Sequence, residues 1–280
     1  MQTIIITTDF SATSRNAARY AAAWGEALEI NHMVLYHAYD DSAVVSEIPL
    51  TEADISQVHE QSLEALEDLE KEVRTVLKDN AKMSIDLVAN GSPLVLGVER
   101  LAERYRADMV VVGASGKSDL EQVMMGSNTV ILASDSQVPL LIVPKKAFFA
   151  PIDKIVFACD LKRVTRSTPV IRIGRLLERL HAKLLVLNAA IEGKRFNPDT
   201  ILEQYKIHDL LDSFQPEYHY TAGDDIADEI EDFAKQQHAG LIITIPKAYG
   251  FFEGLFHKSI SKKLIKESTI PLLLLREKAE

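Results

Sequence analysis

The chain has 280 residues, of which 47% are hydrophobic and 26% are charged, the ordinary balance of a globular protein. Because compact domains cluster at roughly 100 to 150 residues, this length favours two domains over one. The formal net charge of -10 argues against nucleic acid or an anionic membrane as the main partner, and the single cysteine, Cys159, excludes an intrachain disulfide.

The N-terminal segment, residues 1–6, has no basic region before its apolar run. No segment reaches the roughly 18 consecutive apolar residues that a membrane-spanning helix requires. We therefore expect neither a signal peptide nor a membrane span, and we expect a cytoplasmic protein.

Short apolar segments predict strands, and apolar residues at helical spacing predict helices between them. In the first half, the strand segments include residues 4–9, 33–38, 109–112 and 139–143. The predicted helices of this half cover residues 14–27, 55–76, 93–104 and 128–133. Strands and helices therefore alternate along the chain.

The second half repeats the first in two registers. The aligned segments are 4–9 with 155–160 and 33–38 with 184–189 at a shift of 151 residues, then 109–112 with 241–244 and 139–143 with 271–275 at a shift of 132. The two shifts differ by 19 residues, which fall in the loop 39–50 and the helix after it. The first half therefore carries a longer arm beside its second strand.

Short, nearly all-apolar strands that alternate with helices indicate a parallel sheet covered on both faces. The predicted fold class is α/β, with two tandem domains that each contain a five-stranded parallel sheet with helices on both faces, a Rossmann-like arrangement. We place the domains at residues 1–145 and 151–280, with a short join that favours packed domains.

A glycine run follows the fourth strand of the first half. Gly113, Gly116 and Gly126 are followed by Ser127, in the pattern G-x2-G-x9-G-S, before a predicted helix. Glycines at the carboxyl end of a parallel strand let the backbone approach a ligand, and a helix N-terminus attracts phosphate. Asp9, after the first strand, is expected across the same crevice as an acceptor for an adenine amino group or ribose hydroxyls.

Other interpretations of these glycines must be weighed. A P-loop has four residues between its glycines where this run has two, and the dinucleotide fingerprint follows the first strand, not the fourth. Both motifs are excluded. The structural alternative is that the glycines permit turns and Ser127 caps a helix.

Three sequence features resemble the UspA-like universal stress protein family: residues 9–14 after the first strand, Gly91-Ser92-Pro93 before the third helix, and the glycine run. The resemblance covers both halves, as in a tandem two-domain member. It implies an adenine nucleotide α-hydrolase-like fold that retains ATP more often than it turns ATP over. By matching positions it implies base and ribose contacts at Thr7, Asp9 and Ala38, a pocket lined by Val112, and phosphate contacts at Gly113, Gly116, Gly126, Ser127, Asn128 and Thr129.

The second half has lost the three glycines. At the shift of 132 residues, Ile245, Ala248 and Lys258 stand in their places, while Ser259 keeps the serine. A Cβ at each position crowds a triphosphate, so we predict a degenerate domain without ATP. Lys258 and its neighbouring lysines suggest either an anion site or a solvated basic face. The histidines lack metal-ligand spacing, and we expect no metal site.

The predicted function is that of a universal stress protein that binds ATP or another adenine nucleotide in its N-terminal domain and acts in stress response and signalling. Mg²⁺ as a companion of ATP is left open. Asp119 and Glu121 lie in the glycine loop, but no general base is identifiable, so at most slow ATP hydrolysis is expected. The alternatives are an α-hydrolase-type enzyme that hydrolyses ATP or adenylates a substrate, and a nucleotide-free interaction scaffold.

The last strand of each half is strongly apolar and would form an aggregation-prone edge if left bare. We expect residues 140–143 and 272–275 to pair within one chain as a pseudo-dimer. A further homodimer is left open.

Overall fold

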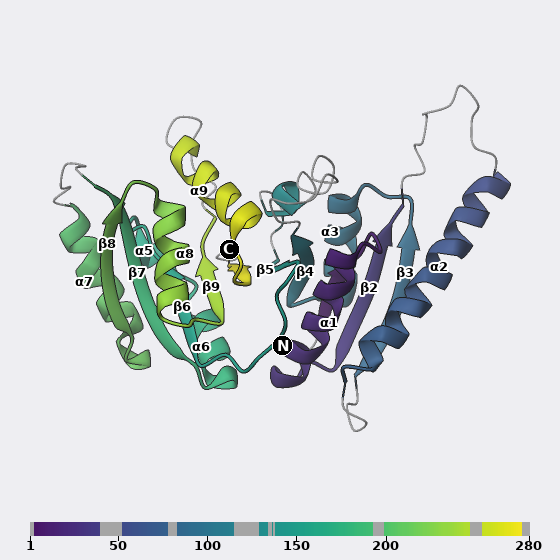
Figure 1. Ribbon diagram of the computed structural model, residues 1–280, viewed down its shortest axis with the longest axis horizontal. Helices are drawn as coiled ribbons and strands as arrows, with labels where there is room; N and C mark the ends of the chain where they lie inside the picture. The colour runs from purple at the N-terminus through teal and green to yellow at the C-terminus, as the bar shows by residue number, and fades with distance from the viewer. Residues whose placement is uncertain are drawn as a thin grey trace. The chain divides into compact units, whose positions relative to one another are not determined.

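A computed structural model describes residues 3–39, 52–77, 83–114, 129–133, 136, 138–192, 199–246 and 254–275. The chain divides into two compact units, Met1–Phe149 and Ala150–Glu280. Each unit is an α/β fold built on its own parallel sheet (Figure 1). None of the helices in the described ranges combines the length and apolarity needed to cross a membrane.

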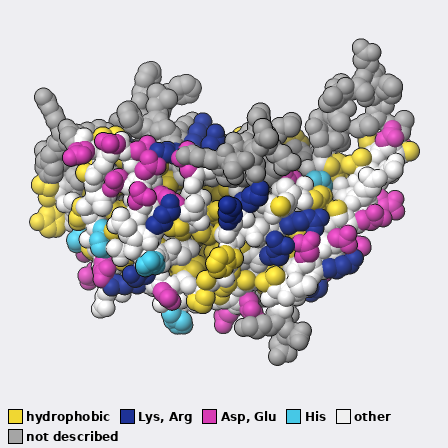
Figure 2. All heavy atoms as spheres, viewed as in Figure 1, with side chains coloured by type: hydrophobic (Ala, Val, Ile, Leu, Met, Phe, Trp, Pro, Cys, Tyr) yellow, Lys and Arg dark blue, Asp and Glu magenta, His cyan; other side chains and the backbone are white. Residues whose placement is uncertain are grey.

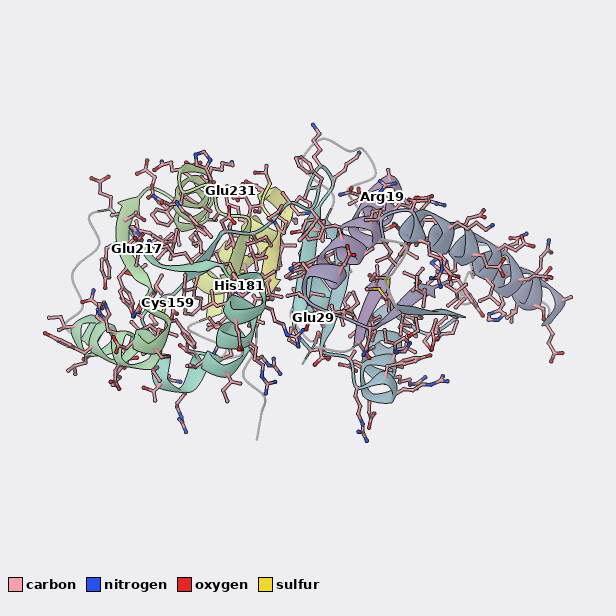
Figure 3. The ribbon with its side chains drawn as sticks, turned by 90° about the horizontal axis from the view of Figure 1, so that it is seen from below. Arg19, Glu29, Cys159, His181, Glu217 and Glu231 are labelled. Atoms are coloured by element: carbon pink, nitrogen blue, oxygen red, sulfur yellow. The ribbon has the colours of Figure 1, made fainter. Side chains whose placement is uncertain are left out.

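The first unit has the sheet order β3-β2-β1-β4-β5, with every described strand pair parallel. Its elements are β1 (Thr3–Thr7), α1 (Ala12–Ala27), β2 (His32–Ala38), α2 (Glu52–Arg74), β3 (Ser84–Asn90), α3 (Leu94–Tyr105), β4 (Met109–Ala114) and β5 (Leu140–Pro144). Residues 129–133, between β4 and β5, are helical. Helices α1 and α2 cover one face of the sheet, while α3 packs under β1 on the other (Figures 1 and 3).

The second unit has the order β10-β9-β6-β7-β8, again with parallel pairs. Its elements are β6 (Lys154–Ala158), α5 (Val164–Ser167), α6 (Val170–Leu180), β7 (Lys183–Ile191), α7 (Asp199–Leu211), the 3-10 turn η1 (Asp212–Phe214), β8 (Glu217–Gly223), α8 (Ile226–Gln236), β9 (Leu241–Thr244), α9 (Gly254–Glu267) and β10 (Leu272–Leu274). The predicted fold class is therefore confirmed in both units.

The core explains the apolar runs of the sequence. All five residues of β1 and of β5 are buried, because helices cover both faces of the sheet. Helix α1 turns small side chains toward the sheet, and Ala17, Ala18, Ala21 and Ala22 are fully buried. Small residues let the helix approach closely, and α1 packs against β4, β5 and β1.

The two predicted registers of the repeat are observed. Ile4 pairs with Met33, and Ile155 pairs with Leu184, which is the same pair shifted by 151 residues. The turns after β1 and β6 also match, because Phe10 and Leu161 both have left-handed backbone conformations, with φ of 62° and 51°. The sequence repeat is therefore a structural repeat down to single turns.

Helix predictions agree with the structure to within about three residues at the ends that can be compared. The helix predicted over 14–27 is α1, and the one predicted over 93–104 is α3. In the second unit, the first helix is broken into α5 and α6, which the simple alternation of elements did not predict. Pro169 supplies no N–H, and a residue before proline avoids the helical region, so Thr168 has an extended ψ of 114°.

Candidate functional site

The first unit changes direction between β1 and β4. From β1 the chain builds β2 and β3 on one side, and then β4 and β5 on the other. In open α/β sheets, ligands bind outside the carboxyl ends of the strands at such a switch point. Thr7 and Val112 are buried at the ends of β1 and β4, Gly113 and Ala38 are half-buried, and Asp9 is exposed. The structure therefore brings five of the predicted site residues to one edge of the sheet.

The loop after β1 is held by its own polar groups. The Asp9 carboxylate accepts the Ser11 N–H at 3.1 Å, and the Thr8 hydroxyl accepts the Phe10 N–H at 2.9 Å. Ser11 caps α1 by accepting the Ser14 N–H at 3.2 Å. This turn keeps the exposed Asp9 at the mouth of the crevice.

Sequence reasoning missed His37, which supports this loop from β2. Its Nδ1 lies 2.8 Å from the Thr8 carbonyl oxygen, and because a carbonyl only accepts, Nδ1 is the donor. The His37 ring also lies 4.5 Å from the Phe10 ring. In the second unit, Asn188 at the equivalent position donates to the Cys159 carbonyl at 2.8 Å. The repeat was the one signal that could have identified this pair of positions.

Gly113, the first glycine of the run, lies close to Thr129, which follows the run. Thr129 is buried, and its hydroxyl lies 3.5 Å from the Gly113 carbonyl oxygen. Gly113 also has a role that the sequence argument did not include. A Cβ there would lie 2.9 Å from the Thr13 carbonyl oxygen, so the glycine allows α1 to approach β4. Gly116, Gly126, Ser127 and Asn128 lie outside the described residues, as do Asp119 and Glu121.

The Gly91-Ser92-Pro93 turn is anchored beside Ala38. Asn90, which pairs with Ala38, accepts the Tyr36 hydroxyl at 2.9 Å and the Ser92 N–H at 3.1 Å. Burial raises the pKa of Tyr36 to about 12, although the hydrogen bond to Asn90 opposes this shift. Gly97 of α3 leaves room for the tyrosine, because a Cβ there would lie 1.8 Å from its hydroxyl oxygen. Tyr36 is therefore tightly packed against α3 beside this turn.

The equivalent crevice of the second unit differs in shape and charge. Strand β9 ends at Thr244, directly before Ile245, whereas β4 continues through Gly113 to Ala114. Helix α5 packs against α7, and Glu203 of α7 accepts the Val164 N–H at 2.7 Å. The backbone N–H at the start of α5 is therefore already bonded to a carboxylate of the protein. Ala248 and the side chain of Lys258 lie outside the described part.

Within the described part of the chain, no three His, Cys, Asp or Glu side chains gather in a way that could hold a metal ion. Cys159, labelled in Figure 3, is buried at the end of β6.

A model of the universal stress protein family matches residues 1–144, slightly more than half of the chain. The chain belongs to the universal stress protein family. The matched region contains every residue of the candidate site, and the family predicted from residues 9–14 and the glycine run is confirmed.

Known proteins resemble this chain in sequence over about half of its length and in fold over both units. A universal stress protein of Methanocaldococcus jannaschii is 23% identical over 161 residues, covering 51% of this chain and 94% of the relative. The crystal structure of a universal stress protein from Archaeoglobus fulgidus has a TM-score of 0.74 at 13% identity and covers 99% of this chain and 98% of its own. The structure of a functionally unknown protein from Pseudomonas aeruginosa has a TM-score of 0.61 at 13% identity and covers 99% of this chain and 93% of its own. These two structures share the fold over nearly the whole chain.

Proposed function

We propose that the first unit binds an adenine nucleotide, with ATP as its main ligand, and that the occupancy of this site serves stress signalling. The observation that carries the proposal is the position of Asp9, Ala38 and the Gly113–Thr129 pair at the β1–β4 switch point. Membership of the universal stress protein family supports the assignment to stress response. The second unit is proposed to bind no ATP, and the protein is proposed to act in the cytoplasm.

Charge decides the orientation of the nucleotide in this proposal. A phosphate beside the Asp9 carboxylate would place like charges together in a partly desolvated crevice, which is unfavourable. The adenine and ribose therefore lie at the Asp9 end, with Thr7, Ala38 and Val112. The phosphates lie toward Gly113, Gly116, Gly126, Ser127, Asn128 and Thr129. This arrangement leaves Asp9 to accept hydrogen bonds from ribose hydroxyls or the adenine amino group.

The described residues fit a nucleotide better than they fit a resident metal. The Thr129 hydroxyl donates to the Gly113 carbonyl oxygen over a long 3.5 Å, and it can turn to donate to a phosphate oxygen instead. No metal-ligand cluster occurs among the described side chains. Mg²⁺ would therefore arrive with ATP, bound by its phosphates and water. No hydrolytic step is proposed.

Calorimetry with ATP and Mg²⁺ on the full chain tests this proposal, with Asp9→Ala and its counterpart Asp160→Ala as a matched pair. We expect one ATP per chain, at least about tenfold weaker binding in Asp9→Ala from the loss of a charged acceptor, and unchanged binding in Asp160→Ala. Both aspartates accept the N–H of the residue two positions on at 3.1 Å, so Asp160→Ala controls for the general effect on the chain of losing one such turn.

A thermal melt gives a second measure, because a ligand that binds only the native state raises stability by about 2.7 kcal/mol at 100 times its Kd. No heat of binding and no rise in melting temperature with excess ATP would leave the nucleotide-free scaffold as the better hypothesis. Two ATP molecules per chain would contradict the proposed asymmetry. Continuous release of phosphate would favour the enzyme alternative.

A further inference from the structure

Arg15 of α1 connects the loop after β1 to the long helix α2. Its Nε–H donates to the Phe10 carbonyl oxygen at 3.1 Å, and its Nη1 forms an ion pair with Glu72, in the last turns of α2. The other carboxylate oxygen of Glu72 accepts from Arg19 at 3.3 Å. Arg19 is labelled on α1 in Figure 3, and Figure 2 shows basic and acidic side chains interspersed over α1 and α2. One guanidinium group therefore contacts both the loop after β1 and α2.

Phe10 has an unusual backbone conformation in the loop after β1. Its φ of 62° is one that residues other than glycine rarely adopt. Asp9 precedes it, and Ser11, whose N–H is bound by the Asp9 carboxylate, follows it. A rotation of the Phe10 peptide would therefore move Asp9 and break its turn. Holding the Phe10 carbonyl oxygen restricts the positions that the Asp9 carboxylate can reach.

Helix α2 is packed along only part of its length. Its buried residues are Ser62, Leu66, Leu69 and Val73, whereas residues 52–57 are all exposed. The packed part lies against β3, β2 and α1, and the N-terminal part projects past the end of β3 (Figure 1). Glu72 thus lies at the packed end of a helix whose N-terminal residues are exposed.

The second unit has the same turn without this link. Leu161 keeps the left-handed conformation, and Asp160 accepts the Lys162 N–H at 3.1 Å. Arg166 stands where Arg15 stands in the first unit, yet among the described residues its side chain makes no hydrogen bond or ion pair. The turn therefore forms without a bond from the arginine at the equivalent position. The arginine link occurs in the half that has the glycine run.

We propose that Arg15 is a positioning residue for nucleotide binding, which couples α2 to the Asp9 loop through Phe10. This inference rests on the proposed function. Arg15 restricts the conformations of the loop after β1 before the ligand binds, so that less conformational entropy is lost on binding. Because coupling between two sites is reciprocal, nucleotide binding must also stabilise the packing of α2, and a partner that holds α2 must raise nucleotide affinity.

The test is calorimetric titration of the full chain with ATP and Mg²⁺, using Arg15→Lys, Arg15→Met and Glu72→Gln, with Arg166→Met as the matched control. Lysine keeps a charge for Glu72 but lacks the planar fork that reaches Phe10 at the same time. We expect Arg15→Lys and Arg15→Met to raise the Kd for ATP by about 5-fold to 20-fold, within the usual range of coupling. Glu72→Gln should raise it less, and Arg166→Met should leave it unchanged.

Hydrogen exchange adds a readout that a purely structural role would not change. ATP should protect the amides of residues 66–74 in the native chain and not in Arg15→Lys. A native chain that does not bind ATP would refute the proposed function itself. If the native chain binds ATP, normal binding by Arg15→Lys, or an equal loss in Arg166→Met, would overturn the positioning role. Should Arg15→Met fail to fold, Arg15→Lys and Glu72→Gln decide the question.

Discussion

Gly113→Ala separates the two roles of the first glycine of the run. A Cβ at this position would lie 2.9 Å from the Thr13 carbonyl oxygen and 3.0 Å from its carbonyl carbon. These are backbone atoms in the first turn of α1, so they cannot rotate away as a side chain would. Helix α1 must shift from β4, and overpacking of this kind costs about 1–3 kcal/mol. The nucleotide-free protein should therefore lose stability.

Scanning calorimetry of the nucleotide-free full chain measures this loss. In a unit of about 150 residues each kcal/mol shifts the melting temperature by about 2–4 °C, so the first-unit transition should fall by roughly 2–12 °C. Gly25→Ala is the matched control, because the one tight contact of its Cβ would be with the flexible end of Met83 at 3.1 Å, and helix propensity favours alanine. It should be neutral or stabilising. If nucleotide-free Gly113→Ala melted like the native chain and only lost ATP binding, the packing explanation would be wrong.

Two further predictions concern each unit separately. Gly97→Ala places a Cβ against the Tyr36 hydroxyl and should lower the free energy of unfolding by about 2 kcal/mol. The same change should cost less in a chain that also carries Tyr36→Leu, which copies Leu187 of the second unit. Additive losses of the two changes in urea unfolding would contradict this prediction. Burial alone raises the pKa of Glu231, but hydrogen bonds led by Thr269 outweigh it and hold the pKa below the usual value of 4.5. The ionised carboxylate between α8 and the segment after α9 (Figure 3) therefore stabilises the second unit above about pH 4.5, and this stabilisation disappears as the pH falls. Glu231→Gln should cost about 1–3 kcal/mol at pH 7, and the cost should shrink as the pH falls through the lowered pKa of Glu231; a cost that does not change with pH would refute the charge argument.

Much of the fold was predictable because parallel strands buried on both faces give short apolar runs. The repeat then fixed which runs correspond, and the observed pairs Ile4–Met33 and Ile155–Leu184 follow that register. Helix ends were less certain, because Ser11 and Ser14 are both suitable caps and only the structure shows that Ser11 is the one used.

The predicted site was less complete than the predicted fold. The sequence located Asp9 and Gly113, because each follows an apolar run and the switch point brings strand ends together. It could not show that Gly113 faces Thr13, or that Arg15 meets Glu72, 57 residues away in sequence. Such contacts depend on how a helix lies on the sheet, which a single sequence does not encode in any short motif.

The two units suggest that the loss of the glycine and the break in the first helix are one structural change. Gly113 lets an unbroken α1 lie on β4. In the second unit Ile245 carries a side chain, and the chain forms a four-residue α5 that packs against α7 and ends at Ser167. A helix that cannot approach the fourth strand must be shortened or moved, and Pro169 completes the break. The crevice of the second unit is thereby altered by the packing of its helix, before any contact with a phosphate is considered. The altered packing of the first helix therefore supports the proposal that the second unit binds no ATP.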